Sequence, residues 1–199
     1  GSMNPTENGV GRNNNNLILI GSQSLASLYQ DEFDELWAGE HGGGATTKHV
    51  FQASDHLQVY FCPEDDCVTA IVAQLETAQH SIYFMIFSFT HDRIGTHLAL
   101  AKERGVHVEG LMEKQQLSKY SMHKFFLQQD IPIVLENTGA FLHHKVFIID
   151  EETIITGSFN PSQNAAERND ENVIIIKNRE FAGRFLEEYQ RLRTQFTDV

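Results

Sequence analysis

The chain alternates between short apolar runs rich in β-branched residues and longer stretches in which apolar residues recur every three or four positions. Runs of the first kind predict strands, and stretches of the second kind predict amphipathic helices. We expect strands over residues 16–20, 57–61, 81–89, 106–112, 131–135 and 172–176, and helices over 24–37, 64–78, 94–104, 121–129 and 179–196. This order favours an α/β fold in which a mixed β-sheet is flanked by helices on both faces.

A hairpin is predicted over residues 145–156, where two β-prone runs are separated by a short polar turn. His143 and Lys145 stand two positions apart at its start and therefore share one face of the strand. Ser158 and Asn160 follow its second strand. A histidine, a fixed cation and hydrogen-bond donors gathered around one point suit a phosphate oxyanion.

This spacing, completed by Asp150 five residues after Lys145, resembles the HKD signature of the phospholipase D superfamily. In the order and length of its elements, the stretch 57–176 resembles the Nuc-like endonuclease branch of that superfamily. The resemblance implies a phosphodiesterase that uses a phosphohistidine intermediate and needs no metal or other cofactor. It also implies that two HKD histidines, one from each of two lobes, meet at one site.

The resemblance gives each polar residue of the motif an expected role. His143 would attack phosphorus or protonate the leaving oxygen, and the near-neutral pKa of histidine suits both tasks. Lys145 and Asn160 would hold the non-bridging phosphate oxygens, with Ser158 as a supporting donor. Glu171 resembles the family's acid that accepts a hydrogen bond from the histidine and fixes its tautomer.

Two further groups complete the candidate site. Asp150 belongs to the motif, but its place in the turn favours a structural role, and His144 alternates away from the site. Lys114, Lys119 and Tyr120 lie in a polar loop after an expected strand, where they would contact a backbone phosphate or stack on a base. A plain surface loop is an equal alternative.

An internal repeat sets the expected domain organisation. When the chain is shifted by 156 positions, residues 1–8 align with 157–164, and the identities continue without a gap into the following strand and helix. We therefore expect residues 1–37 to be the tail of a first HKD-like lobe, 38–48 a glycine-rich linker, and 49–199 a complete HKD lobe. Residues 1–3 are also compatible with an expression scar.

The repeat bears on partners, because the first lobe's H-x-K is absent from this chain. The second histidine would then come either from a symmetric copy or from a missing N-terminal half. We expect a homodimer in which two His143 side chains face one another.

Bulk properties narrow the class of protein. A net charge of −12 argues against non-specific coating of nucleic acid, although it leaves room for a local basic groove. No apolar run approaches the roughly 18 residues of a membrane span, so no stable membrane anchor is expected. Cys62 and Cys67 are expected to be unpaired thiols, as in a cytoplasmic protein, rather than a disulfide or zinc ligands.

Three function classes remain. The first is a metal-independent nuclease acting on nucleic acid, which the Nuc-like resemblance favours. The second is a phospholipase D or phosphatidyl transferase that uses the same site on lipid headgroups. The third is a non-catalytic HKD lobe that serves assembly or nucleic-acid binding.

Overall fold

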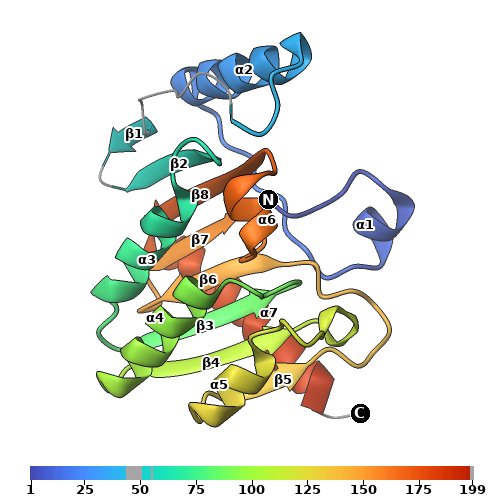
Figure 1. The fold of residues 1–199 in the computed structure, drawn as a ribbon, viewed down its shortest axis with the longest axis vertical. Helices are drawn as coiled ribbons and strands as arrows, with labels where there is room; N and C mark the ends of the chain where they lie inside the picture. Colours follow the sequence, from blue (N-terminus) through green and yellow to red (C-terminus); the bar gives the residue numbers. More distant parts are fainter. Residues whose placement is uncertain (44–50, 55, 198–199) are drawn as a thin grey trace.

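One large mixed sheet forms the centre of the computed structural model, which describes residues 1–43, 51–54 and 56–197 (Figure 1). The strands follow one another across the sheet in the order β1-β2-β8-β7-β6-β3-β4-β5. Their bounds are β1 Phe51–Ser54, β2 Leu57–Cys62, β3 Ser81–Ile86, β4 His107–Met112, β5 Ile133–Leu135, β6 Lys145–Ile149, β7 Thr153–Gly157 and β8 Glu171–Lys177. Strands β3, β4 and β5 are parallel, and the other neighbouring pairs are antiparallel. The predicted mixed sheet is confirmed.

Helices cover both faces of the sheet, as predicted (Figure 1). Helices α3, α4 and α5 pack on one face, and α7 packs on the other. The helix bounds are α1 Glu7–Gly11, α2 Gln23–Ala38, α3 Cys67–Thr77, α4 Asp92–Glu103, α5 His123–Gln128, α6 Gln163–Glu167 and α7 Arg179–Thr197, with a 3₁₀ turn, η1, at Lys114–Gln116. Within the described residues, no helix is both long enough and apolar enough to cross a membrane.

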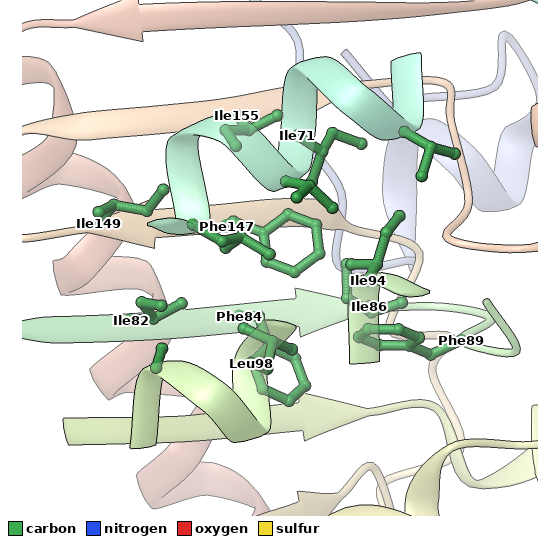
Figure 2. Close-up of a cluster of buried hydrophobic side chains, with 14 of the residues drawn as sticks. Ile71, Ile82, Phe84, Ile86, Phe89, Ile94, Leu98, Phe147, Ile149 and Ile155 are labelled. Carbon is green, nitrogen blue, oxygen red and sulfur yellow. The ribbon is translucent and has the colours of Figure 1, made fainter. Parts of the chain in front are cut away.

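The larger core lies between β3 and the helix pair α3 and α4 (Figure 2). Ile82, Phe84 and Ile86 alternate along β3 toward this face, where Leu98 of α4 lies beside Phe84 (Figure 2). Ile71 of α3 lies over the neighbouring strands, beside Phe147 and Ile155 (Figure 2). Gly110 on the neighbouring β4 leaves room for the Phe84 ring, since a Cβ there would stand 2.1 Å from it. This packing fixes β3, which in turn carries the hairpin β6–β7 by antiparallel pairing with β6.

The structure corrects three of the sequence predictions. Residues 16–20 are not a strand, because among the described residues the only strand-like pairing of this segment is the isolated bridge of Asn14 to Leu142, just before it. Helix α3 begins at Cys67 rather than at residue 64, since Asp66 caps it by accepting from the Thr69 N–H. Cys62 and Cys67 are not free thiols but form a disulfide across that turn.

The predicted linker is covered only in part. Gly39 ends α2 in a left-handed conformation with φ 89°, and the Gly42 N–H donates to Asp170 at 2.7 Å. Residues 44–48 of the linker lie outside the described residues.

Candidate active site

The ends of five strands meet at one edge of the sheet. β6 begins there with Lys145 and β7 ends there with Gly157, because the two strands form an antiparallel hairpin. The parallel strands β3 and β4 end at the same edge, and β8 begins there with Glu171. Side chains carried just beyond these strand ends therefore converge, and they include most of the predicted motif.

His143 lies against an aromatic ring and a main-chain carbonyl. Its imidazole meets the Phe87 ring edge-on, with centroids 4.7 Å apart. Its Nδ1 lies 2.8 Å from the Ser2 carbonyl oxygen, which can only accept, so Nδ1 carries the hydrogen and Nε2 is the unprotonated nitrogen of the neutral ring. Burial and the Lys145 charge lower the pKa of His143, outweighing the bond to Ser2. The lowered pKa favours the neutral form of the ring.

Lys145 is held within the same cluster. Its side chain is 5% exposed, its Nζ donates to the His143 carbonyl at 2.9 Å, and the ammonium stands 4.9 Å from the centre of the Phe87 ring. Burial lowers the pKa of Lys145 to about 7, against the opposing pull of the Glu171 carboxylate. A bound phosphate would supply the negative charge that keeps this ammonium protonated.

The turn after β7 presents Ser158 and Asn160. Ser158 is used by the scaffold, since its hydroxyl accepts from the Asn172 N–H at 3.0 Å and its own N–H donates to Asn172. Asn160 is half-buried, and its Oδ1 is a buried oxygen without a hydrogen-bond partner among the described residues. Ser158 is therefore a positioning residue, and Asn160 retains free amide hydrogen-bonding capacity.

Glu171 does not make the predicted bond to His143. Its carboxylate accepts from the Asn169 side chain at 3.1 Å, and its charge raises the pKa of Lys145. In the structure, the hydrogen-bond partner of the His143 Nδ1 is the Ser2 carbonyl. The predicted bond is thus not formed in this structure, and the charge of Glu171 favours the protonated form of Lys145.

Asp150 lies at the far end of β6, away from the cluster. Its carboxylate accepts from the backbone N–H groups of Gln79, His80 and Ser81 at 2.7 to 2.9 Å. Burial works to raise the pKa of Asp150, but these three bonds outweigh it and the pKa is lowered. Asp150 therefore lies apart from the other candidate catalytic residues, and its three bonds agree with the structural role expected for it at the turn.

His144 points to the other side of the strand, as predicted. It is almost completely buried, its Nδ1 lies 3.2 Å from the Asn16 amide nitrogen, and its Nε2 lies 3.7 Å from Glu188 on α7. His144 thus contacts both the N-terminal segment, at Asn16, and helix α7, at Glu188.

The loop after β4 carries Lys114, Lys119 and Tyr120 at the surface. All three are exposed, and the Lys119 ammonium stands 4.8 Å from the centre of the Tyr120 ring. The loop leaves the sheet at the same edge as the motif. Its contact with substrate remains a prediction.

Sequence reasoning missed two residues that shape the site. Phe87 contacts both His143 and Lys145, and Glu113 is fully buried with one carboxylate oxygen accepting from the Leu142 N–H at 2.8 Å and the other from Gln115. Each follows the last residue of a parallel strand. That position was the available signal, because sites in α/β proteins gather at the carboxyl ends of parallel strands.

A histidine, a buried lysine whose charge a phosphate would stabilise, and a free amide are thus brought together at one edge of a mixed α/β sheet, an arrangement that suits a phosphodiester. Residues 71–193 match the family described as "Cardiolipin synthase, PLD-like domain". A phospholipase D of Rickettsia prowazekii (strain Madrid E) is 36% identical over 140 residues, which are 70% of this chain and 68% of that protein. The human mitochondrial cardiolipin hydrolase is 28% identical over 133 residues, covering 66% of this chain and 53% of that protein. The chain therefore belongs to the phospholipase D superfamily of phosphodiesterases.

Comparison with solved structures shows to which branch of the superfamily the chain belongs. The crystal structure of Nuc from Salmonella typhimurium, itself described as a phospholipase D family member, superposes with a TM-score of 0.67 at 31% identity. The match covers 70% of this chain and 94% of Nuc. The chain belongs to the Nuc-like branch of the superfamily.

Proposed function

We propose that this protein is a metal-independent phosphodiesterase that cleaves nucleic acid through a phosphohistidine intermediate. The observation that carries the proposal is the orientation of His143, whose Nδ1–H is held by the Ser2 carbonyl while Nε2 keeps its lone pair. A histidine held in this tautomer is a ready nucleophile. The cluster of His143, Lys145 and Asn160 needs no metal ligand for this step.

The proposed reaction has two displacements. Nε2 of His143 attacks phosphorus, a nitrogen–phosphorus bond forms, and the bond to the leaving oxygen breaks as that oxygen takes a proton from a second histidine. Water then attacks phosphorus, returns its proton to the second histidine, and releases His143. Lys145 and the Asn160 amide stabilise the non-bridging oxygens in both steps.

Aromatic surface beside the site supports nucleic acid as the substrate. Phe141 is partly exposed and packs on Phe87, which contacts His143, while Tyr120 is largely exposed on the neighbouring loop. Aromatic side chains next to a phosphate site offer stacking surfaces for bases. The similarity to Nuc agrees with this assignment.

A lipid substrate is the second candidate, because the relatives from Rickettsia are named phospholipase D and the mammalian relatives cardiolipin hydrolase. The cluster of His143, Lys145 and Asn160 would then act on the phosphodiester of a lipid headgroup.

The deciding experiment offers the chain, with EDTA present, single- and double-stranded DNA, RNA, and vesicles of phosphatidylcholine with cardiolipin. We expect cleavage of nucleic acid, loss of at least about 1,000-fold in His143→Ala, and no effect in the matched variant His80→Ala at the opposite edge of the sheet. Turnover of lipid with intact oligonucleotides would replace the first candidate by the second. Complete loss of activity on chelation would remove the metal-independent mechanism.

A further inference from the structure

Three glutamates from two separate elements face one another beside helix α2. Glu32 and Glu35 lie three residues apart on that helix, and Glu64 lies in the turn between β2 and α3. Each offers a carboxylate oxygen, and the three oxygens lie within 4.8 Å of one another. The cluster stands at the β1–β2 end of the sheet (Figure 1). Strands β8 and β7 separate β2 from β6, which carries Lys145, so the cluster is separate from the phosphate site.

Both elements hold their glutamates in place. One turn before the first glutamate, the Tyr29 ring of α2 meets Phe61 of β2 edge-on, with ring centres 5.0 Å apart. The turn that carries Glu64 is closed by the disulfide between Cys62 and Cys67. The three carboxylates therefore converge because the packing of α2 and the closed turn direct them to one point.

Glu32 is a buried acid with an oxygen that lacks a donor. The residue is 9% exposed, its carboxylate is directed at the other two, and its Oε2 has no hydrogen-bond partner among the described residues. The Oε2 of Glu64 is buried and likewise without a partner in the described part of the chain. A buried carboxylate oxygen without a donor is unfavourable unless the group is protonated or binds a cation.

The surroundings of Glu32 are acidic. Burial raises the pKa of Glu32 to about 7, and four acids act in the same direction, namely Glu64, Glu35, Asp170 and Asp65. Asp65 and Asp170 already accept from backbone N–H groups, at 2.8 and 2.7 Å. A cation at the cluster would favour the ionised form of Glu32, and its binding would release a proton.

The charge pattern of α2 also favours a cation here. Asp31, Glu32, Asp34 and Glu35 place like charges three and four positions apart, which destabilises a helix. The last turn of this fully described helix contains no basic residue, although positive charge is favourable at a helix C-terminus. A cation held by Glu32 and Glu35 would offset both effects.

We propose that Glu32, Glu35 and Glu64 bind one Ca²⁺ ion, which cross-links helix α2 to the turn between β2 and α3. Carboxylate oxygens suit a hard cation, whereas softer metals favour nitrogen and sulfur ligands. Ca²⁺ holds oxygens at roughly 2.3–2.6 Å in adaptable geometry, so its ligands stand up to about 5 Å apart, a range that includes this cluster. Mg²⁺ demands a near-ideal octahedron at about 2.1 Å, which side chains from two elements fit less readily. The ion goes beyond the proposed function and takes no part in its chemistry.

The test uses the full chain after metal ions have been removed with a chelator and the chelator has been washed out. Titration calorimetry with CaCl₂ should show one site with a Kd on the order of 10–100 μM, and MgCl₂ should bind at least about tenfold more weakly. Ca²⁺ at about 100 times its Kd should raise Tm by roughly 5 °C or more.

Glu32→Gln keeps the shape of the side chain and removes one ligand charge. Without Ca²⁺ we expect this variant to be at least as stable as the wild type, because it removes a carboxylate that is buried among other acids. With Ca²⁺ it should bind at least about tenfold more weakly and lose the gain in Tm, so the order of stability reverses. Glu64→Gln, on the other element, should lose the gain as well. Asp31→Asn, exposed on the same helix, makes the same charge change and should keep the gain.

Tb³⁺, which replaces Ca²⁺ at oxygen sites, tests the position of the ion. Trp37 is the only tryptophan of the chain and follows Glu32 by five residues on α2, about 7.5 Å along the helix axis. Selective excitation of tryptophan should therefore sensitise Tb³⁺ emission, and excess Ca²⁺ should remove it by competition. Trp37→Phe should remove the emission and leave the Ca²⁺ affinity measured by calorimetry unchanged.

A wild type whose Tm does not respond to Ca²⁺ would overturn the proposal and make Glu32 a protonated buried acid. A gain in Tm that Glu32→Gln and Glu64→Gln both retain, or that occurs without sensitised emission, would place the ion elsewhere and overturn it too. Tighter binding of Mg²⁺ would refute the choice of ion. Turnover measured well below the Tm of the chelated chain should not change, so loss of turnover there contradicts the proposed function and leaves the Ca²⁺ site to its own test.

Discussion

At the scale of single residues, the site is governed by how burial changes the charge of two basic groups. Lys145 is held beside His143 with its pKa lowered to about 7, so the two groups approach neutrality together and His143 keeps its nucleophilic lone pair. A bound phosphate would favour the protonated form of Lys145, so that the ammonium is present when it contacts the phosphate oxygens. Sequence spacing predicted which residues these are, but the loss of charge depends on burial by Phe87 and the surrounding strands, which no local pattern reports.

The lowered pKa of Lys145 predicts how the free energy of unfolding depends on pH. The folded-state pKa of about 7 lies below the ordinary 10.5, so between these values the unfolded chain binds more protons and the free energy of unfolding rises with pH. We expect the wild type to gain up to roughly 1.4 kcal/mol per pH unit across this window relative to Lys145→Met. Denaturant titrations of both proteins from pH 6 to 10 measure it, and parallel curves would contradict the burial of a neutral lysine.

Glu113 gives a prediction for positioning. In Glu113→Gln one of its two acceptor oxygens becomes a donor facing a backbone N–H, so a bond to Leu142 or Gln115 is lost at a cost of about 1–3 kcal/mol. Because Leu142 precedes His143, we expect kcat to fall about tenfold while KM changes little. Steady-state kinetics and a melting curve check this, and Gln115→Ala, which keeps the backbone bond, is the matched control. Unchanged kcat in a destabilised variant would reduce Glu113 to a purely structural residue.

At the scale of elements, the hairpin β6–β7 carries the motif because its two ends are fixed separately. The turn end is held by Asp150 on the start of β3, and the site end by Glu113 and by the pairing of Ser158 with Asn172. The hairpin, the sheet and most helices were predictable because periodicity is local. The failed strand at residues 16–20 shows the limit, since a strand requires neighbours that sequence pattern cannot supply.

Asp150 allows the two ends of the hairpin to be tested independently. Asp150→Ala removes the acceptor of three backbone N–H groups and should lower the free energy of unfolding by about 2–4 kcal/mol, while the folded fraction keeps its kcat. Asp150→Gly, which relieves the positive φ of 52° at this position, separates backbone strain from the lost bonds. A drop in kcat measured on fully folded protein would return Asp150 to the active site.

At the scale of the whole molecule, charge opposes the proposed substrate. The net charge of −12 repels a polyanion at long range, whereas exposed local cations such as Lys114 and Lys119 attract it. We expect kcat/KM for DNA to rise about threefold or more as salt increases from 10 to roughly 150 mM, because screening weakens this repulsion. A small monoanionic phosphodiester should show almost no dependence. A fall in kcat/KM with the slope of counterion release would instead indicate an extended basic groove.

The proposed covalent step is tested most directly by the stereochemistry at phosphorus. An oligonucleotide with a single phosphorothioate linkage of one configuration is cleaved in ¹⁸O-labelled water with EDTA present, and the configuration of the product is determined. Attack by His143 followed by attack by water inverts phosphorus twice, so the account predicts net retention and loss of the reaction in His143→Ala. Net inversion would mean that water attacks the substrate directly, and would contradict a phosphohistidine at His143.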